Sequence, residues 1–181
     1  FESSMAKLAG STKQYGYDTE DTNEKVKELY GYFEDEQVAV NAITNLQGIG
    51  LSQAELNKTT DAAIAVWSAY GDSIPIESLT ESINETSQVG KVTGVLGDAL
   101  KFAGLSEDEF NKKLESCKTT QERAKLVTDT LNGAYSDSKA VYDQITESSR
   151  KLSEAQHELK TKEDQLSDAV EPVKAEFESL K

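Results

Sequence analysis

A row of apolar residues at strict intervals of seven dominates the last quarter of this chain of 181 residues. The segment from Asp137 to Lys181 contains no glycine and one proline, Pro172. A seven-residue apolar repeat is typical of a helix that packs along a partner as a coiled coil. We therefore expect a long heptad-patterned helix over residues 137–181, with an apolar self-association seam made of Ile145, Leu152, Leu159, Leu166, Val173 and Leu180.

The companion row of this seam is polar in its middle. Polar residues at such positions indicate a weak coil, or one in which they set the register. The partner is either another copy of the chain or the helices that precede the segment. Pro172 is expected to kink or interrupt the helix, and His157 is expected to be solvent-exposed on it. The companion row runs through Tyr142, Ser149, Gln156, Glu163, Val170 and Phe177.

The preceding residues also have a helical pattern, because their apolar positions recur at intervals of three and four and strand-like alternation is nearly absent. The sequence therefore predicts an all-α fold, with a compact helical domain over residues 17–136 and one long C-terminal helix of coiled-coil character. Residues 1–16 are expected to be an N-terminal helical remnant of a longer chain, which starts here at Phe1. Trp67 lies on the apolar stripe of a helix expected over residues 53–70, either in the core or as an exposed stacking platform.

One motif occurs twice, as GLSQAELNK at Gly50–Lys58 and GLSEDEFNK at Gly104–Lys112. In each copy the serine can cap a helix, the glutamate three residues later can bond back to the cap N–H, and the flanking apolar residues can pack together. The glycine suits the left-handed end of the preceding helix. A third start is expected at Thr119, with Glu122 in the same role. We interpret six residues as helix-corner capping residues, without a catalytic role: Gly50, Ser52, Glu55, Gly104, Ser106 and Glu109.

Three glycines fall within a helix expected over residues 89–103. Gly90, Gly94 and Gly97 recur at four and three, which would place them on one helical face. Each costs about 1 kcal/mol relative to alanine in a helix interior. These glycines either let a neighbouring helix approach closely or form a hinge. They do not indicate a phosphate-binding loop, because such a loop follows a strand and has a Lys-Ser or Lys-Thr pair after its last glycine, and neither feature is present. The next helix is expected over residues 120–132, ending near Gly133.

The charge and composition exclude several kinds of site. The 33 Asp and Glu residues exceed the 19 Lys and Arg, for a net charge of -14, which argues against sequence-specific nucleic-acid binding and against anionic membranes. No apolar run is long enough for a membrane segment. Cys117 and His157 are the only residues of their kinds, so no metal site or cofactor is expected, and a lone thiol fits a reducing cytoplasm. No pair of carboxylates falls in apolar surroundings that would raise a pKa, so we expect no catalytic residue and no enzyme.

The order of segments between Ile43 and Gly133 resembles the tail tape measure proteins of long-tailed bacteriophages and prophages. The resemblance is carried by ETSQVGKVTGVLGDAL, GLSEDEFNKKLESCKTTQER and TDTLNGAYSD, and extends more weakly over residues 17–138. It implies a structural protein of the virion that helps to set tail length. It also implies assembly in the bacterial host cytoplasm and a final location in the lumen of the tail tube. The implied partners are other copies of the chain, tail tube proteins and tail assembly chaperones.

Two other functions stay open at this level. The compact part could be a helical binding module that docks another tail or chaperone protein through an exposed apolar patch, and an exposed Trp67 would favour this alternative. A carboxylate-based cell-wall hydrolase is the third alternative, because some members of the family carry such a domain elsewhere in the chain. No residue of that domain is identified in this sequence.

Overall fold

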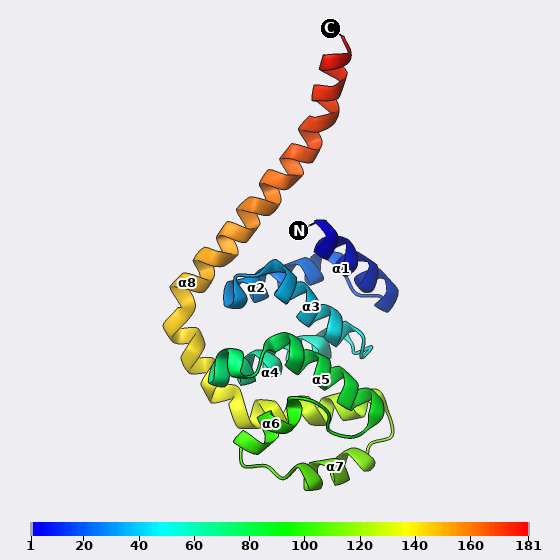
Figure 1. Cartoon of the computed structure of the whole chain (residues 1–181), viewed down its shortest axis with the longest axis vertical. Coiled ribbons are helices and arrows are strands. Elements are labelled where there is room, and N and C mark those ends of the chain that lie inside the picture. Colours follow the sequence, from blue (N-terminus) through cyan, green and yellow to red (C-terminus); the bar gives the residue numbers. More distant parts are fainter. Residues whose placement is uncertain (1, 181) are drawn as a thin grey trace.

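The computed structural model describes residues 2–180, so Phe1 and Lys181, the outer ends of the expected ranges 1–16 and 137–181, lie outside the described residues. Within this range the chain is helical without a strand, which confirms the all-α prediction (Figure 1). A bundle of shorter helices forms a compact body, and one long helix leaves it. The elements are α1 (Glu2–Tyr15), α2 (Thr19–Phe33), α3 (Glu36–Gln47), α4 (Gln53–Tyr70), the 3-10 turn η1 (Gly71–Ser73), α5 (Ile76–Val89), α6 (Leu96–Phe102), α7 (Glu107–Glu115) and α8 (Thr120–Ser179).

The core of the body surrounds α4, whose residues 62–66 are all buried. One apolar cluster joins α4 to α5, α6 and the first part of α8, with Leu79, Leu100 and Leu131 fully buried. A second cluster brings Leu8 of α1 and Leu29 of α2 against α3. Each fully buried leucine stabilises the fold by about 1.5–3 kcal/mol. Because Leu8 belongs to this core, α1 is an integral helix of the body.

The two repeated motifs both start helices. Ser52 is the N-cap of α4, and its hydroxyl accepts from the Glu55 N–H at 3.3 Å. Ser106 is the N-cap of α7 and accepts from the Glu109 N–H at 3.2 Å. Among residues 2–180, neither glutamate carboxylate accepts from the N–H of its cap serine, so only half of each expected capping box is formed.

The two corners differ in how their apolar residues pack. Gly50 and Gly104 both have the left-handed backbone expected of them, with φ of +79° and +75°. Leu51 before the first cap is buried, whereas Leu105 before the second is 40 % exposed. The first corner therefore packs into the core, and the second covers the end of the body.

The prediction of a single helix over residues 89–103 is wrong. Helix α5 ends at Val89, and α6 begins only at Leu96. Gly90 and Gly94 have left-handed backbones, with φ of +77° and +56°, so they cannot lie with Gly97 on one face of a helix. The three glycines instead belong to a loop and the start of a short helix.

Polar contacts to neighbouring helices hold this loop in place. The Ser82 hydroxyl of α5 accepts from the Leu96 N–H at 3.0 Å and donates to the Thr93 carbonyl oxygen. Asn111 of α7 accepts from the Val92 N–H at 2.8 Å. Gly94 lies so close to Ser82 that an added Cβ would be 3.2 Å from its hydroxyl oxygen. The loop therefore joins α5, α6 and α7 closely.

Helix α8 is longer than expected. It runs without a break for 60 residues, about 90 Å at 1.5 Å per residue. The expected end near Gly133 is wrong, since the helix passes through it. Of the kink or interruption expected at Pro172, the interruption does not occur, because Pro172 lies inside the helix. The boundary between residues 136 and 137 thus falls inside one helix, whose first part belongs to the body. From Gln165 to Leu180 every residue is exposed, and this part projects away from the body (Figure 1).

Candidate functional site

The predicted seam lies on the solvent-exposed side of α8. The exposed fractions of its six residues range from 59 % at Leu159 to 80 % at Leu180. Val141 and Phe177 add to the same apolar surface, with exposed fractions of 57 % and 67 %. The row from Ile145 to Leu180 spans about 50 Å of helix. Of the two partners considered, the preceding helices do not cover the seam.

The opposite side of α8 faces the body. Tyr142, Thr146, Arg150, Ser153 and His157 are all buried or half-buried, and they recur at intervals of three and four. Leu159 of the seam is about 200° around the helix axis from His157, because each residue turns the helix by about 100°. The helix therefore has one polar face against the body and one apolar face in solvent.

Polar side chains make most of the contact between this part of α8 and α2. Tyr32 of α2 donates from its hydroxyl to the Asp143 carboxylate at 2.6 Å. Arg150 donates to the Asp143 carbonyl oxygen at 2.8 Å, and its guanidinium lies 4.9 Å from the centre of the Tyr32 ring. Burial, together with the bond to Asp143, raises the pKa of the Tyr32 hydroxyl. These contacts fix the direction in which α8 leaves the body.

His157 is buried, and its expected exposure is wrong. Its ring is 8 % exposed, bonds through Nε2 to the Glu36 carboxylate, and lies 4.9 Å from the Tyr30 ring, centre to centre. Ser153, one turn earlier, donates to the Glu34 carboxylate at 2.7 Å. The physical reason is that the turn between α2 and α3 places both glutamates against α8. Glu36 Oε1 is buried without a hydrogen-bond partner among the described residues.

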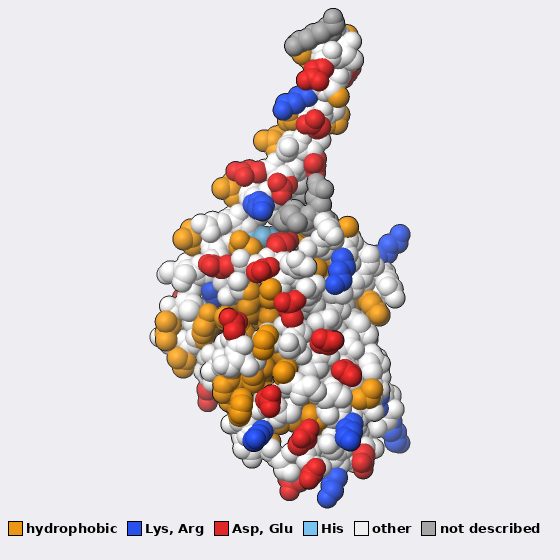
Figure 2. Space-filling model, in the orientation of Figure 1, with side chains coloured by type: hydrophobic (Ala, Val, Ile, Leu, Met, Phe, Trp, Pro, Cys, Tyr) orange, Lys and Arg blue, Asp and Glu red, His pale blue; other side chains and the backbone are white. Residues whose placement is uncertain are grey.

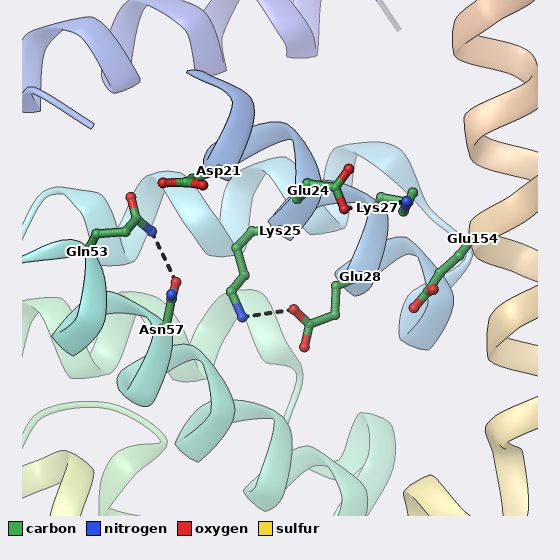
Figure 3. A pocket seen from close by; sticks show the side chains of 8 residues that line it. All are labelled: Asp21, Glu24, Lys25, Lys27, Glu28, Gln53, Asn57 and Glu154. Carbon is green, nitrogen blue, oxygen red and sulfur yellow. Dashed lines mark hydrogen bonds and ion pairs between the residues drawn. The ribbon is translucent and has the colours of Figure 1, made fainter. Parts of the chain in front are cut away.

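A polar pocket of about 410 Å³ opens between α2 and α4, with Glu154 of α8 at its edge (Figure 3). Figure 3 shows the Lys25 ammonium and the Glu28 carboxylate pointing at one another, at 2.8 Å. Lys27 pairs with Glu24 at 3.4 Å. Two of the four carboxylates that line the pocket are therefore paired with lysines, and the lining keeps two more acidic than basic side chains.

Burial beside this pocket perturbs two carboxyl groups. Asp61 of α4 and Glu154 of α8 both have a pKa raised chiefly by burial, and the nearby Lys25 and Arg150 respectively oppose the rise. The sequence expectation concerned a pair of carboxylates, whereas burial here raises the pKa of two separate carboxyl groups. No carboxylate–carboxylate bond joins them within residues 2–180, and no group of three His, Cys, Asp or Glu residues there has the geometry of a metal site. Such carboxyl groups hold a proton to higher pH.

Trp67 lies at the edge of the core and faces a second pocket. Its ring packs edge-to-face against Phe33, 4.8 Å between ring centres, and against Tyr142 at 5.3 Å. The side chain is half-buried and contacts both apolar clusters. Trp67 therefore packs at the edge of the core, which is the first of the two roles considered for it. Sequence reasoning missed the pocket, because its lining comes from five separate elements.

Comparison with protein-family models, curated proteins and solved structures finds no match to this chain. No helix in the described range is both long and apolar enough to cross a membrane. Function is therefore proposed from the sequence resemblance and from the seam described above.

Proposed function

We propose that the chain is a structural component of a long-tailed phage tail, a segment of a tape measure protein that associates with other copies through α8. The assignment to a phage tail rests on the sequence resemblance between Ile43 and Gly133. The observation that supports association through α8 is the row of six apolar side chains, each at least 59 % exposed, on a 60-residue helix. A rod of this kind supplies length, and its outer face supplies a contact. In this role the chain assembles in the bacterial cytoplasm and ends in the lumen of the tail tube, beside tube and chaperone proteins.

A second copy is the partner that suits the outer face best. Apolar surface gains about 25 cal/mol per Å² when it leaves water, so an uncovered row of about 50 Å favours association. The same row on another chain has the matching interval of seven. The body lies on the opposite side of α8, so it does not obstruct the approach. The polar Gln156 and Glu163 weaken the contact in its middle, because a parallel pair places each against its own copy.

Sedimentation equilibrium tests the contact. The wild-type chain is expected to form oligomers as its concentration rises, and the variant Ile145→Asp/Leu152→Asp is expected to stay monomeric because two charges would enter the seam. A matched control is Gln144→Asp/Gln165→Asp, which adds the same charge at two exposed positions outside the seam. Equal masses for the wild type and the seam variant would remove the seam as the association contact.

Electron microscopy of virions tests the length role. Inserting six heptads after Leu166, with the apolar interval of seven kept, lengthens the rod by about 63 Å. Tails assembled with this chain are expected to be longer by the same amount. A control insertion of equal length made of glycine and serine has no fixed helical length and should not reproduce the increment. Tails of unchanged length with the helical insertion would contradict the proposal.

A further inference from the structure

The pocket beside Trp67 combines an apolar floor with an acidic rim. It has a volume of about 300 Å³ and lies where the turn between α2 and α3 meets the turn between α4 and α5. Its apolar floor combines two buried side chains with four that are at least partly exposed: Tyr32 and Ile76, and Phe33, Val38, Trp67 and Pro75. Figure 2 shows hydrophobic side chains gathered in the middle of this face, over the region between α2 and α4 in Figure 1. We call this pocket the Trp67 groove.

Three carboxylates form the rim of the Trp67 groove: Asp35, Asp72 and Glu77. Asp35 accepts from the Val38 N–H at 3.1 Å, and Glu77 accepts from the Asn41 side chain at 2.6 Å. Within residues 2–180, none of the three forms an ion pair with a lysine or arginine.

This absence of cations distinguishes the groove from the polar pocket between α2 and α4. There, Lys25 and Lys27 each pair with a glutamate. At the Trp67 groove no lining residue is a lysine or arginine, and Lys7 donates to Asn41 rather than to a rim carboxylate, so the field of the three carboxylates favours the approach of a cationic partner. The apolar floor adds a requirement, since a fully hydrated cation gains little from covering aromatic and aliphatic carbon.

We propose that the Trp67 groove binds a short segment of another protein in which a large apolar side chain stands between lysine or arginine residues. The apolar side chain covers the floor, and the flanking cations meet the three rim carboxylates. A central apolar anchor with a charged periphery is the usual arrangement of protein interfaces. The groove is lined by α2 to α5, so this interaction is separate from association through the seam and goes beyond the proposed function.

Trp67 reports on this binding directly, because it is the only tryptophan in the chain. The probe is the capped peptide Lys-Lys-Phe-Lys-Lys, titrated against the full chain while Trp67 emission is recorded. It is expected to change the emission to saturation. Lys-Lys-Gly-Lys-Lys lacks the anchor and Ser-Ser-Phe-Ser-Ser lacks the cations, so each is expected to bind at least about tenfold more weakly. Added salt should weaken the binding of Lys-Lys-Phe-Lys-Lys more than the binding of Ser-Ser-Phe-Ser-Ser.

A pair of variants separates the groove from the overall negative charge. The variant Asp72→Asn/Glu77→Gln keeps a side-chain oxygen that can accept from Asn41. It is expected to weaken the binding of Lys-Lys-Phe-Lys-Lys about fivefold. The control Glu81→Gln/Asp98→Asn removes the same charge at two exposed residues that do not line the groove, and is expected to leave binding unchanged. Equal loss in both variants, binding of the glycine peptide as tight as that of the phenylalanine peptide, or no saturation would overturn the proposal.

Discussion

Replacing Gly94 with alanine is expected to lower the free energy of unfolding by about 2 kcal/mol. Gly94 has φ of +56°, a left-handed backbone that costs an L-residue about 1 kcal/mol. The new Cβ would also lie 3.2 Å from the Ser82 hydroxyl oxygen and 3.4 Å from the Ser82 Cβ, so Ser82 has to move.

Ser82 is not free to move without loss. Its hydroxyl accepts from the Leu96 N–H at 3.0 Å and donates to the Thr93 carbonyl oxygen, and these bonds fix the loop between α5 and α6. Weakening one such bond costs about 1 kcal/mol. Together with the backbone term this gives the total of about 2 kcal/mol.

Urea unfolding measures the change, followed by far-UV circular dichroism and by Trp67 fluorescence. The midpoint should fall by about 1 M if the denaturant slope is about 2 kcal/mol per molar and unchanged. Gly133→Ala is the matched control, because Gly133 lies in α8 and nothing comes within 4 Å of its added Cβ. That variant should be more stable, by about 0.5–1 kcal/mol. If Gly94→Ala is as stable as the wild type or more so, the close contact with Ser82 is not what the loop depends on.

Three further substitutions test the polar contacts and the seam. Asp61→Asn should raise the free energy of unfolding at pH 7, because burial raises the pKa of Asp61 in the folded state and so disfavours its charged form. Urea titrations should show this gain shrinking as the pH falls through the folded pKa, and a gain independent of pH contradicts the reasoning. His157→Ala should lower the free energy of unfolding by about 1–3 kcal/mol in the same assay, since Glu36 loses its partner. The middle of α8 should then become sensitive to limited proteolysis, and unchanged stability argues against the contact. Glu163→Leu should strengthen self-association in sedimentation velocity, and weaker association places Glu163 outside the contact.

The starts of the helices could be predicted because capping is a local property. Ser52, Ser106 and Thr119 each accept from the N–H three residues later, and no distant residue is needed for this. The glycines after Val89 could not be assigned in the same way. A glycine fits both a helix interior and a left-handed end, and the choice at Gly94 depends on Ser82, twelve residues earlier.

The continuation of α8 was missed because packing outweighs a local penalty. Gly133 costs about 1 kcal/mol in a helix. Leu131 and Tyr135 on either side of it are both buried, and their burial offsets that cost. The Tyr135 hydroxyl also donates to the Ala99 carbonyl oxygen of α6, which ties this part of the helix to the body.

The candidate sites divide in a similar way. The seam could be predicted because its interval of seven is written in one segment, although only the structure shows that the preceding helices leave it uncovered. The burial of His157 depends on Glu36, 121 residues away, and no pattern around either residue indicates that contact. The Trp67 groove likewise joins residues from Tyr32 to Glu77, so its acidic rim is recognisable only after folding.

The strict interval of seven on α8 also determines the path that any second strand must follow. Two turns of a straight α-helix take slightly more than seven residues, so a row spaced by seven drifts by about 20° per interval. Over the five intervals from Ile145 to Leu180 the drift reaches about 100°. The stripe therefore winds around the axis in a left-handed spiral, and a straight rod laid along it would lose the stripe after a few turns. Only a strand that wraps with it can follow the stripe to Leu180.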